Sequence, residues 1–292
     1  MKAIPFLSLA VALLVLTPRG GNAQGAALKR AAFDGVELEY ELRGAGPAVV
    51  LLHNGAGVDW FRPLLDESAL TKRYRLLSYR RVGFGGSSKL AGPISFAQEA
   101  AHCRSLMRHL KIERAHVVGH SSSGMLALKL ALDAPDAVQS LALLEPALMA
   151  VPSPPQVLEA LQLHRAGETA RALDVFFRGT CGPDYRAALD KALPRTFDEA
   201  MAHADRFFGQ ELPALRQLSF GPEEAKRITQ PVLVVLWEKT GPKHRERRDL
   251  LLAWLPNVEP FVLPKASHLL HVENPRGMAK GLAAFFARHA IR

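Results

Sequence analysis

The stretch that decides the fold is Val118-Gly119-His120-Ser121-Ser122-Ser123-Gly124. It joins an apolar run, Ala115–Gly119, to a run of small and apolar residues, Ser122–Leu132. The first run is typical of a buried strand, and the second is typical of a helix. A serine between them sits on a tight turn, with its hydroxyl exposed above the sheet at the positive end of the helix dipole. The pattern therefore indicates Ser121 as a nucleophile.

Strand-like and helix-like segments alternate on both sides of this turn. Their spacing is that of βαβ units, so we expect an α/β fold with a mainly parallel, doubly wound sheet and helices on both faces. Strands are expected at Val36–Leu42, Ala48–His53, Arg75–Tyr79, Val138–Leu144, Pro231–Trp237 and Glu259–Leu263, and helices at Phe96–Leu110 and Pro275–His289.

The pattern changes over residues 147–229, where no convincing strand is found. Helical stretches broken by proline or glycine are expected instead, at Gln156–Gly179, Tyr185–Leu193 and Phe197–Gly209. We interpret this segment as a helical insertion between two parts of one core, residues 24–146 and 230–292. With 292 residues, the chain is long enough for one large domain of this kind.

The first 23 residues form a separate segment. Lys2 is followed by a nearly continuous apolar run from Ile4 to Leu16, and Gly21-Asn22-Ala23 supplies small residues for cleavage. This is typical of a signal peptide, so we expect an exported protein, periplasmic or secreted. The apolar run is shorter than the roughly 20 residues that a membrane span needs, and no membrane span is expected after its removal.

Charge and cysteine content exclude several other classes. The net charge is +9, but the basic residues are scattered and no long basic run is interleaved with aromatic residues, so no nucleic-acid partner is expected. Cys103 and Cys181 could pair in an exported protein, or they could stay free. Two cysteines without suitably placed histidines give no metal-binding signature.

Four stretches in order, LLHNGAG, YRRVGFGGSS, VVGHSSSG and PKASHLLHVENP, make the chain resemble the α/β-hydrolase superfamily over nearly its whole mature length. The resemblance implies a Ser-His-acid triad, an oxyanion hole and no cofactor. It also implies that the helical insertion is a lid.

A serine hydroxyl needs a base to take its proton, and the resemblance places that base on the loop after the last strand. His268, in Lys265-Ala266-Ser267-His268-Leu269, stands there. The competing residue is His271, at a position that usually supports the site. Order and context favour His268.

The triad acid departs from the usual pattern. Most members of the superfamily carry an aspartate after the strand that follows the lid, where this chain has Thr240. A threonine cannot stabilise the imidazolium that forms during attack. Some members place the acid after the sixth strand instead, and Glu145 stands there. We therefore predict Glu145 as the third member, with Glu238 as its main competitor.

The resemblance assigns the oxyanion hole to the backbone N–H groups of Ser122 and Gly55. Asn54 stands where glycine is usual, so the donor could be shifted by one residue. The lid carries the adjacent pairs Phe176-Phe177 and Phe207-Phe208. One or two of these rings, together with Trp60 or Trp237, could line an apolar pocket.

These features favour a serine hydrolase that cleaves a small or medium carboxylic ester through an acyl-enzyme on Ser121. The same triad would also serve a C–C bond, lactone or amide hydrolase or a perhydrolase. A different class is a non-catalytic ligand-binding protein on this fold. All of these functions imply a small-molecule partner, and no metal or cofactor is expected.

Overall fold

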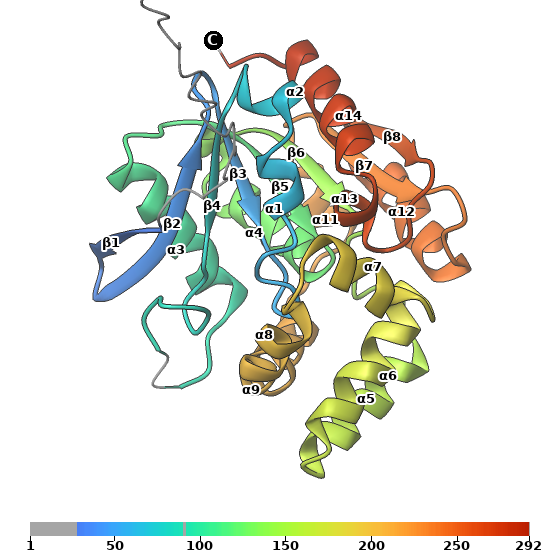
Figure 1. Ribbon diagram of the computed structural model, residues 1–292. Coiled ribbons are helices and arrows are strands. Elements are labelled where there is room, and N and C mark those ends of the chain that lie inside the picture. The colour runs from blue at the N-terminus through green and yellow to red at the C-terminus, as the bar shows by residue number, and fades with distance from the viewer. Residues whose placement is uncertain (1–27, 90–91, 292) are drawn as a thin grey trace, which may run out of the picture.

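A single mixed sheet of eight strands forms the centre of the computed structural model (Figure 1), which describes residues 28–89 and 92–291. The expected signal peptide lies outside the described residues. The strand order is β1-β2-β4-β3-β5-β6-β7-β8. The first two strands run antiparallel to their neighbours, and the other neighbouring pairs are parallel. The strands span Lys29–Phe33, Val36–Arg43, Ala48–Leu52, Arg75–Tyr79, Ala115–His120, Val138–Leu144, Val232–Trp237 and Val258–Leu263.

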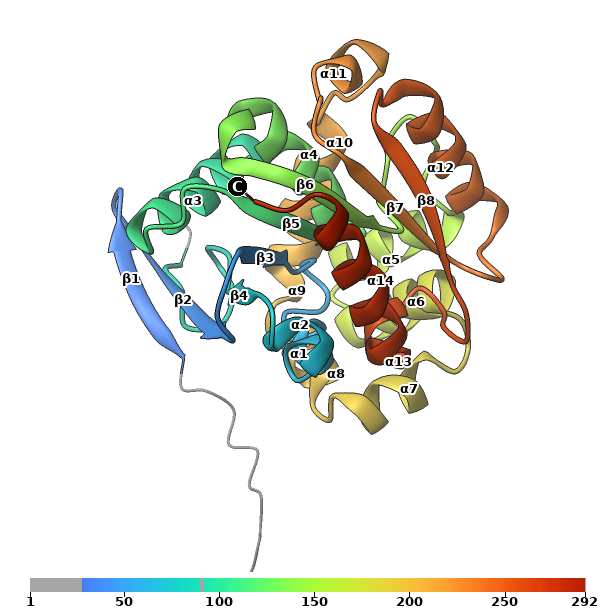
Figure 2. The same cartoon turned by 90° about the horizontal axis from the view of Figure 1, so that it is seen from above.

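Helices cover both faces of the sheet, as expected, and Figure 2 shows them on either side of the strands. On one face, α3 (Phe96–His109) and α4 (Ser122–Asp133) contribute to one apolar cluster. On the other, α1 (Arg62–Leu65), α2 (Ser68–Thr71) and α14 (Pro275–Arg288) contribute to a second cluster. The central strand β3 is buried along its whole length, as its continuous apolar sequence requires.

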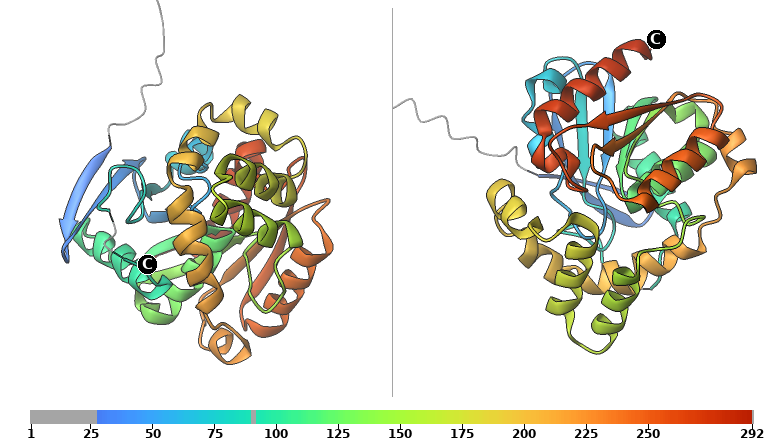
Figure 3. Two further views of the ribbon diagram at one scale, coloured as in Figure 1. Left: turned by 90° about the horizontal axis from the view of Figure 1, so that it is seen from below. Right: turned by 90° about the vertical axis from the view of Figure 1, so that its right-hand side faces the viewer.

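The helical insertion between β6 and β7 gathers at one end of the sheet (Figures 1 and 3). It is more broken than the sequence suggested. The single helix expected over Gln156–Gly179 is two helices, because Gly167 adopts φ 83° between them. The elements are α5 (Pro155–Arg165), α6 (Thr169–Cys181), α7 (Tyr185–Ala192), α8 (Thr196–Ala202), α9 (Ala204–Arg206), the π-helical turn η2 (Phe207–Glu211), α10 (Leu212–Gln217) and α11 (Pro222–Lys226).

Several elements are absent from the sequence-based prediction, among them α1, α2, β1, α12 (Pro242–Trp254) and α13 (Leu270–Glu273). Strand β1 pairs with β2 through a tight turn at Asp34-Gly35, where both residues have positive φ. Helix α12 follows β7, and the short helix α13 follows the loop that carries His268. None of the described helices is long and apolar enough to cross a membrane.

The two cysteines are not paired. Cys103 lies on α3 and Cys181 ends α6, and both thiols are free and buried. Burial raises the pKa of each thiol to about 12. Both side chains therefore contribute as small apolar groups rather than as reactive thiolates.

Candidate active site

Ser121 occupies the turn between β5 and α4, with φ 53° and ψ −119°. Residues other than glycine rarely adopt such a φ. The backbone holds the turn, since the Ser121 N–H donates to the Leu144 carbonyl at 2.9 Å and the Ala147 N–H donates to the Ser121 carbonyl at 3.1 Å. A Cβ at Gly119 would collide with the Ser123 carbonyl. This strained turn places Ser121 in the wall of a pocket.

The loop after β3 is braced by His53. The Arg81 N–H donates to His53 Nε2 at 3.1 Å, and His53 Nδ1 lies 2.8 Å from the Asn54 carbonyl. Ser123, where glycine is usual, donates its hydroxyl to the His53 carbonyl at 2.5 Å. Burial and the nearby Arg81 charge hold the pKa of His53 well below its ordinary value. The neutral ring therefore ties the loop to its neighbours.

The structure brings His268 and Glu145 together. His268 Nδ1 lies 2.7 Å from Glu145 Oε2. The Thr240 hydroxyl donates to the other carboxylate oxygen, Oε1. Burial opposes the negative charge, but the hydrogen bond and charge of His268, with help from Thr240, bring the pKa of Glu145 below its ordinary value. Thr240 thus stands beside the carboxylate as a hydrogen-bond donor.

Neither competitor occupies this arrangement. Glu238 is exposed and accepts the Lys265 N–H at 3.4 Å. His271 is fully buried and stacks on Phe61 with ring centroids 4.4 Å apart. Neither nitrogen of His271 has a hydrogen-bond partner among the described residues. Burial and the neighbouring His268 lower the pKa of His271 to about 3, so its ring stays neutral.

His120 connects the loop after β3 to the loop that carries His268, a role that the sequence did not indicate. Asn54 Nδ2 donates to His120 Nδ1 at 2.7 Å, and His120 Nε2 lies 2.9 Å from the His268 carbonyl. A neutral ring with its proton on Nε2 satisfies both contacts. Burial, with His268 and His271 nearby, holds the pKa of His120 well below its ordinary value. The position of His120 directly before Ser121 is the one available sequence signal.

One expected oxyanion donor, the Gly55 N–H, and the side chain of Ser122 both contact a carboxylate from the helical insertion. The Gly55 N–H donates to Glu211 Oε1 at 3.1 Å, and the Ser122 hydroxyl donates to the same oxygen at 2.5 Å. The Ala56 N–H is also engaged, by Asn54 Oδ1 at 2.9 Å. The assignment of Gly55 as a donor therefore stays a prediction, and it requires that Glu211 release this amide. Ser122 opens α4, and the first N–H groups of a helix have no acceptor within it.

Glu211 belongs to a buried chain of charges that joins the insertion to the core. Arg81 pairs with Glu211 at 2.5 Å and with Glu99, which also pairs with Arg206. Burial alone would raise the pKa of Glu211, but the charges of Arg81 and Arg206 bring it below its ordinary value. No sequence pattern indicated that Glu211 would also reach the Gly55 amide, because the two residues are 156 positions apart.

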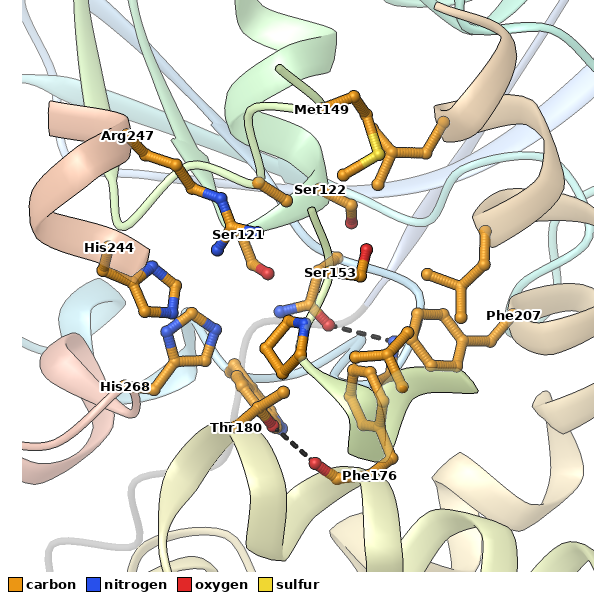
Figure 4. Close-up of a pocket in the computed structure, with 18 residues that line it drawn as sticks. Ser121, Ser122, Met149, Ser153, Phe176, Thr180, Phe207, His244, Arg247 and His268 are labelled. Atoms are coloured by element: carbon orange, nitrogen blue, oxygen red, sulfur yellow. Dashed lines mark hydrogen bonds between the residues drawn. The ribbon is translucent and has the colours of Figure 1, made fainter. Parts of the chain in front are cut away.

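A pocket opens beside Ser121 and His268 (Figure 4). Phe176 and Phe207 line it, whereas Phe177 and Phe208 pack in the core. Trp60 is also in its wall, and Trp237 is not. Its apolar residues are Ala56, Trp60, Ala147, Met149, Pro154, Val157, Phe176, Phe207, Leu212 and Leu215; its polar residues are Asn54, Ser121, Ser122, Ser153, Thr180, His244, Arg247 and His268.

Two pocket residues come from the unpredicted helix α12, His244 and Arg247. The ring centroids of His244 and His268 lie 5.2 Å apart, and burial lowers the pKa of His244 to about 4. In the part of the chain that the structure describes, His244, His268 and Glu145 are the group whose ligand atoms lie close enough to share a metal ion. Both Glu145 oxygens already accept hydrogen bonds, so a cation would have to displace one.

Comparison with known proteins gives one family. The model of the "Alpha/beta hydrolase family" matches residues 49–280. A Klebsiella pneumoniae protein named as a carbamate hydrolase is 33% identical over 204 residues, which is 65% of this chain and 73% of the relative. The acetyltransferase component of an acetoin-cleaving system from Cupriavidus necator is 36% identical over 127 residues, or 44% of this chain. The chain spans only 34% of that relative's length.

The fold similarity extends over nearly the whole structure. The crystal structure of an enol-lactonase from Burkholderia xenovorans LB400 superimposes with a TM-score of 0.75 at 25% sequence identity. The match covers 89% of this chain and 100% of the lactonase chain. The names of these relatives give different activities, whereas the superposition shows the shared fold.

Proposed function

Since the chain belongs to the alpha/beta hydrolase family, we propose that it is a serine hydrolase that cleaves a small or medium carboxylic ester through an acyl-enzyme on Ser121. The observation that carries the proposal is the 2.7 Å contact of His268 Nδ1 with the buried Glu145, because His268 lines the same pocket as Ser121. This contact leaves His268 Nε2 free to act as the base. The proposed triad is therefore Ser121, His268 and Glu145.

In the proposed reaction, His268 Nε2 takes the Ser121 proton as Oγ attacks the ester carbonyl. Backbone N–H groups of Ser122 and Gly55 stabilise the resulting oxyanion once Glu211 releases the Gly55 amide. The imidazolium then gives its proton to the departing alcohol, and an acyl-enzyme remains. Water, deprotonated by His268, attacks this ester, and the acid product leaves as Ser121 regains its proton.

Each residue that supports His268 has a place in this reaction. Glu145 holds the His268 ring in one tautomer and stabilises the imidazolium, and Thr240 keeps the carboxylate oriented. His120 fixes the His268 backbone against Asn54. The apolar remainder of the pocket suits an acyl or alcohol chain of modest size.

The proposal is tested by covalent labelling with a fluorophosphonate and by hydrolysis of a panel of 4-nitrophenyl esters of increasing acyl length. We expect stoichiometric labelling of the wild type, none of Ser121→Ala, and turnover that peaks at short or medium chains. Equal labelling of Ser121→Ala, or binding of esters without turnover, would reject the proposal and favour a ligand-binding protein.

The acid is tested by comparing two isosteric variants. Glu145→Gln should lower kcat by about 10³- to 10⁴-fold, because the imidazolium loses its counter-charge. Glu238→Gln, on an exposed side chain, should stay within about twofold of the wild type. The reverse ranking would move the acid to Glu238 and leave Ser121 and His268 unaffected.

A further inference from the structure

Arg247 presents an unusual charge in the pocket wall. It lies on α12, is 3% exposed, and lines the same pocket as Ser121 and His268. Figure 4 shows its side chain extending from the helix toward the part of the pocket that holds Ser121. The side chain is therefore buried by protein on most sides and open to the pocket on another.

The hydrogen bonds of Arg247 all go to one backbone segment. Its Nε donates to the Leu148 carbonyl at 3.2 Å, and Nη2 donates to the carbonyls of Val151 and Pro152 at 3.4 and 3.5 Å. These contacts are long for charge-assisted hydrogen bonds. Among residues 28–89 and 92–291, no carboxylate lies within ion-pair distance of Arg247.

The other buried arginines are all paired. Arg80 contacts Asp59 at 2.5 Å, Arg81 contacts two glutamates, and Arg206 contacts Glu99. Burying a charge without a counter-charge is unfavourable. Arg247 is thus the buried arginine, within the described chain, that forms no ion pair, and the charges of Glu145 and Glu246 act on it only from farther away.

A ligand carboxylate in the pocket would supply the direct ion pair that Arg247 lacks. The guanidinium presents fixed, planar donors that match a carboxylate, commonly in a bidentate contact. The pocket around it is largely apolar, which strengthens such a pair because water is partly excluded. The reacting carbonyl must lie at Ser121, so the group that pairs with Arg247 is a second one, at another point of the substrate.

We propose that Arg247 binds a free carboxylate of the substrate, and that the natural substrate is a carboxylate-bearing ester such as a monoester of a dicarboxylic acid. This inference rests on the proposed ester hydrolysis and names its substrate class. Arg247 is a specificity-determining residue here, and it takes no part in proton transfer. The competing interpretation is that Arg247 only clamps the segment from Leu148 to Pro152.

The test compares two substrates of similar shape, 4-nitrophenyl hydrogen glutarate, which carries a carboxylate, and the neutral 4-nitrophenyl pentanoate. We expect wild-type kcat/KM to be at least tenfold higher for the glutarate ester. Arg247→Gln should lower kcat/KM for the glutarate ester about 100-fold, mainly through KM, and change the pentanoate value less than threefold. Arg247→Lys, which keeps the charge without the fork, should retain part of the preference.

Arg245→Gln is the matched control, because Arg245 is an exposed arginine on the same helix. It should leave both substrates unchanged. Equal losses for both esters in Arg247→Gln would show a clamp and overturn the inference. A wild-type preference for the neutral ester would overturn it too, and this measurement decides the matter even if the variant fails to fold.

Failure of this inference can be told apart from failure of the proposed function. If the wild type hydrolyses the neutral ester through Ser121 but gains nothing from the carboxylate, the substrate class is wrong and the esterase proposal stands. If Ser121 is not labelled by a fluorophosphonate and neither ester is cleaved, both are wrong.

Discussion

Replacing His271 by phenylalanine should make the stability of the fold less sensitive to acid. The His271 ring is fully buried, stacks on Phe61, and has neither nitrogen hydrogen-bonded within the described residues. Its pKa in the folded protein is lowered to about 3, from an ordinary value of 6.5. Between these two values the unfolded chain binds a proton at this position and the folded chain does not.

The direction and size of this pH dependence follow from proton linkage. The contribution of the neutral His271 ring to the free energy of unfolding is fully present above pH 6.5. It is lost as the pH falls toward 3, because protonation favours the unfolded state. Over the middle of this range, one such group contributes a slope of about 1.4 kcal/mol per pH unit. His271→Phe should remove that contribution, whatever constant offset the larger ring adds through packing.

The assay is urea unfolding followed by circular dichroism at several pH values from 4.5 to 7.5 (about four settings suffice). The difference in unfolding free energy between His271→Phe and the wild type should change by about 1.4 kcal/mol per pH unit below pH 6. Phe61→Leu, which alters the stacking partner, should lower stability equally at every pH. Parallel curves for His271→Phe and the wild type would refute a neutral, buried His271.

Three further predictions concern Thr240, Glu211 and Gly119. Thr240→Val should lower kcat about tenfold, because Glu145 loses one charged hydrogen bond. Adding Thr240→Asp to the Glu145→Gln variant should restore part of the lost activity. Stopped assays with one ester measure both effects. Glu211→Gln should destabilise the protein by about 3–5 kcal/mol in urea unfolding, because it breaks a buried ion pair, whereas Asp133→Asn at an exposed pair should cost under about 1 kcal/mol. Gly119→Ala should give insoluble protein or abolish fluorophosphonate labelling, because the added methyl meets backbone.

The sheet could be predicted because the apolar content of each strand reflects how far that strand is buried. The run Ala48–Leu52 is apolar throughout because β3 is buried on both faces, and the strands Arg75–Tyr79 and Val138–Leu144 have the bounds expected from their sequences. Helix α12 was missed because it is dominated by charged residues that hide its apolar period. In the insertion, Gly167 at positive φ divided what sequence periodicity suggested was one helix.

The contact between Glu145 and His268 could be anticipated because chemistry restricts the choice of residue there. The threonine at 240 made the usual acid position unsuitable, which pointed to Glu145, and the structure places that carboxylate on His268. Contacts across the fold had no such signal. The engagement of Gly55 by Glu211 and the exposure of Arg247 to the pocket depend on how separate elements pack, which local pattern does not encode.

The contacts of both His268 and Thr240 with the carboxylate of Glu145 have an evolutionary consequence. Strands β6 and β7 are parallel neighbours, with Leu144 at the end of β6 opposite Val235 of β7, and the two backbones lie about 4.8 Å apart there. Glutamate is one methylene longer than aspartate and can span part of that offset from the β6 end to the same histidine. The acid of the triad can then follow either of two adjacent strands. A lineage could pass from one position to the other through an intermediate that carries both acids. A motif search that demands an aspartate after β7 would discard such chains as degenerate, although the proposed triad is complete in them.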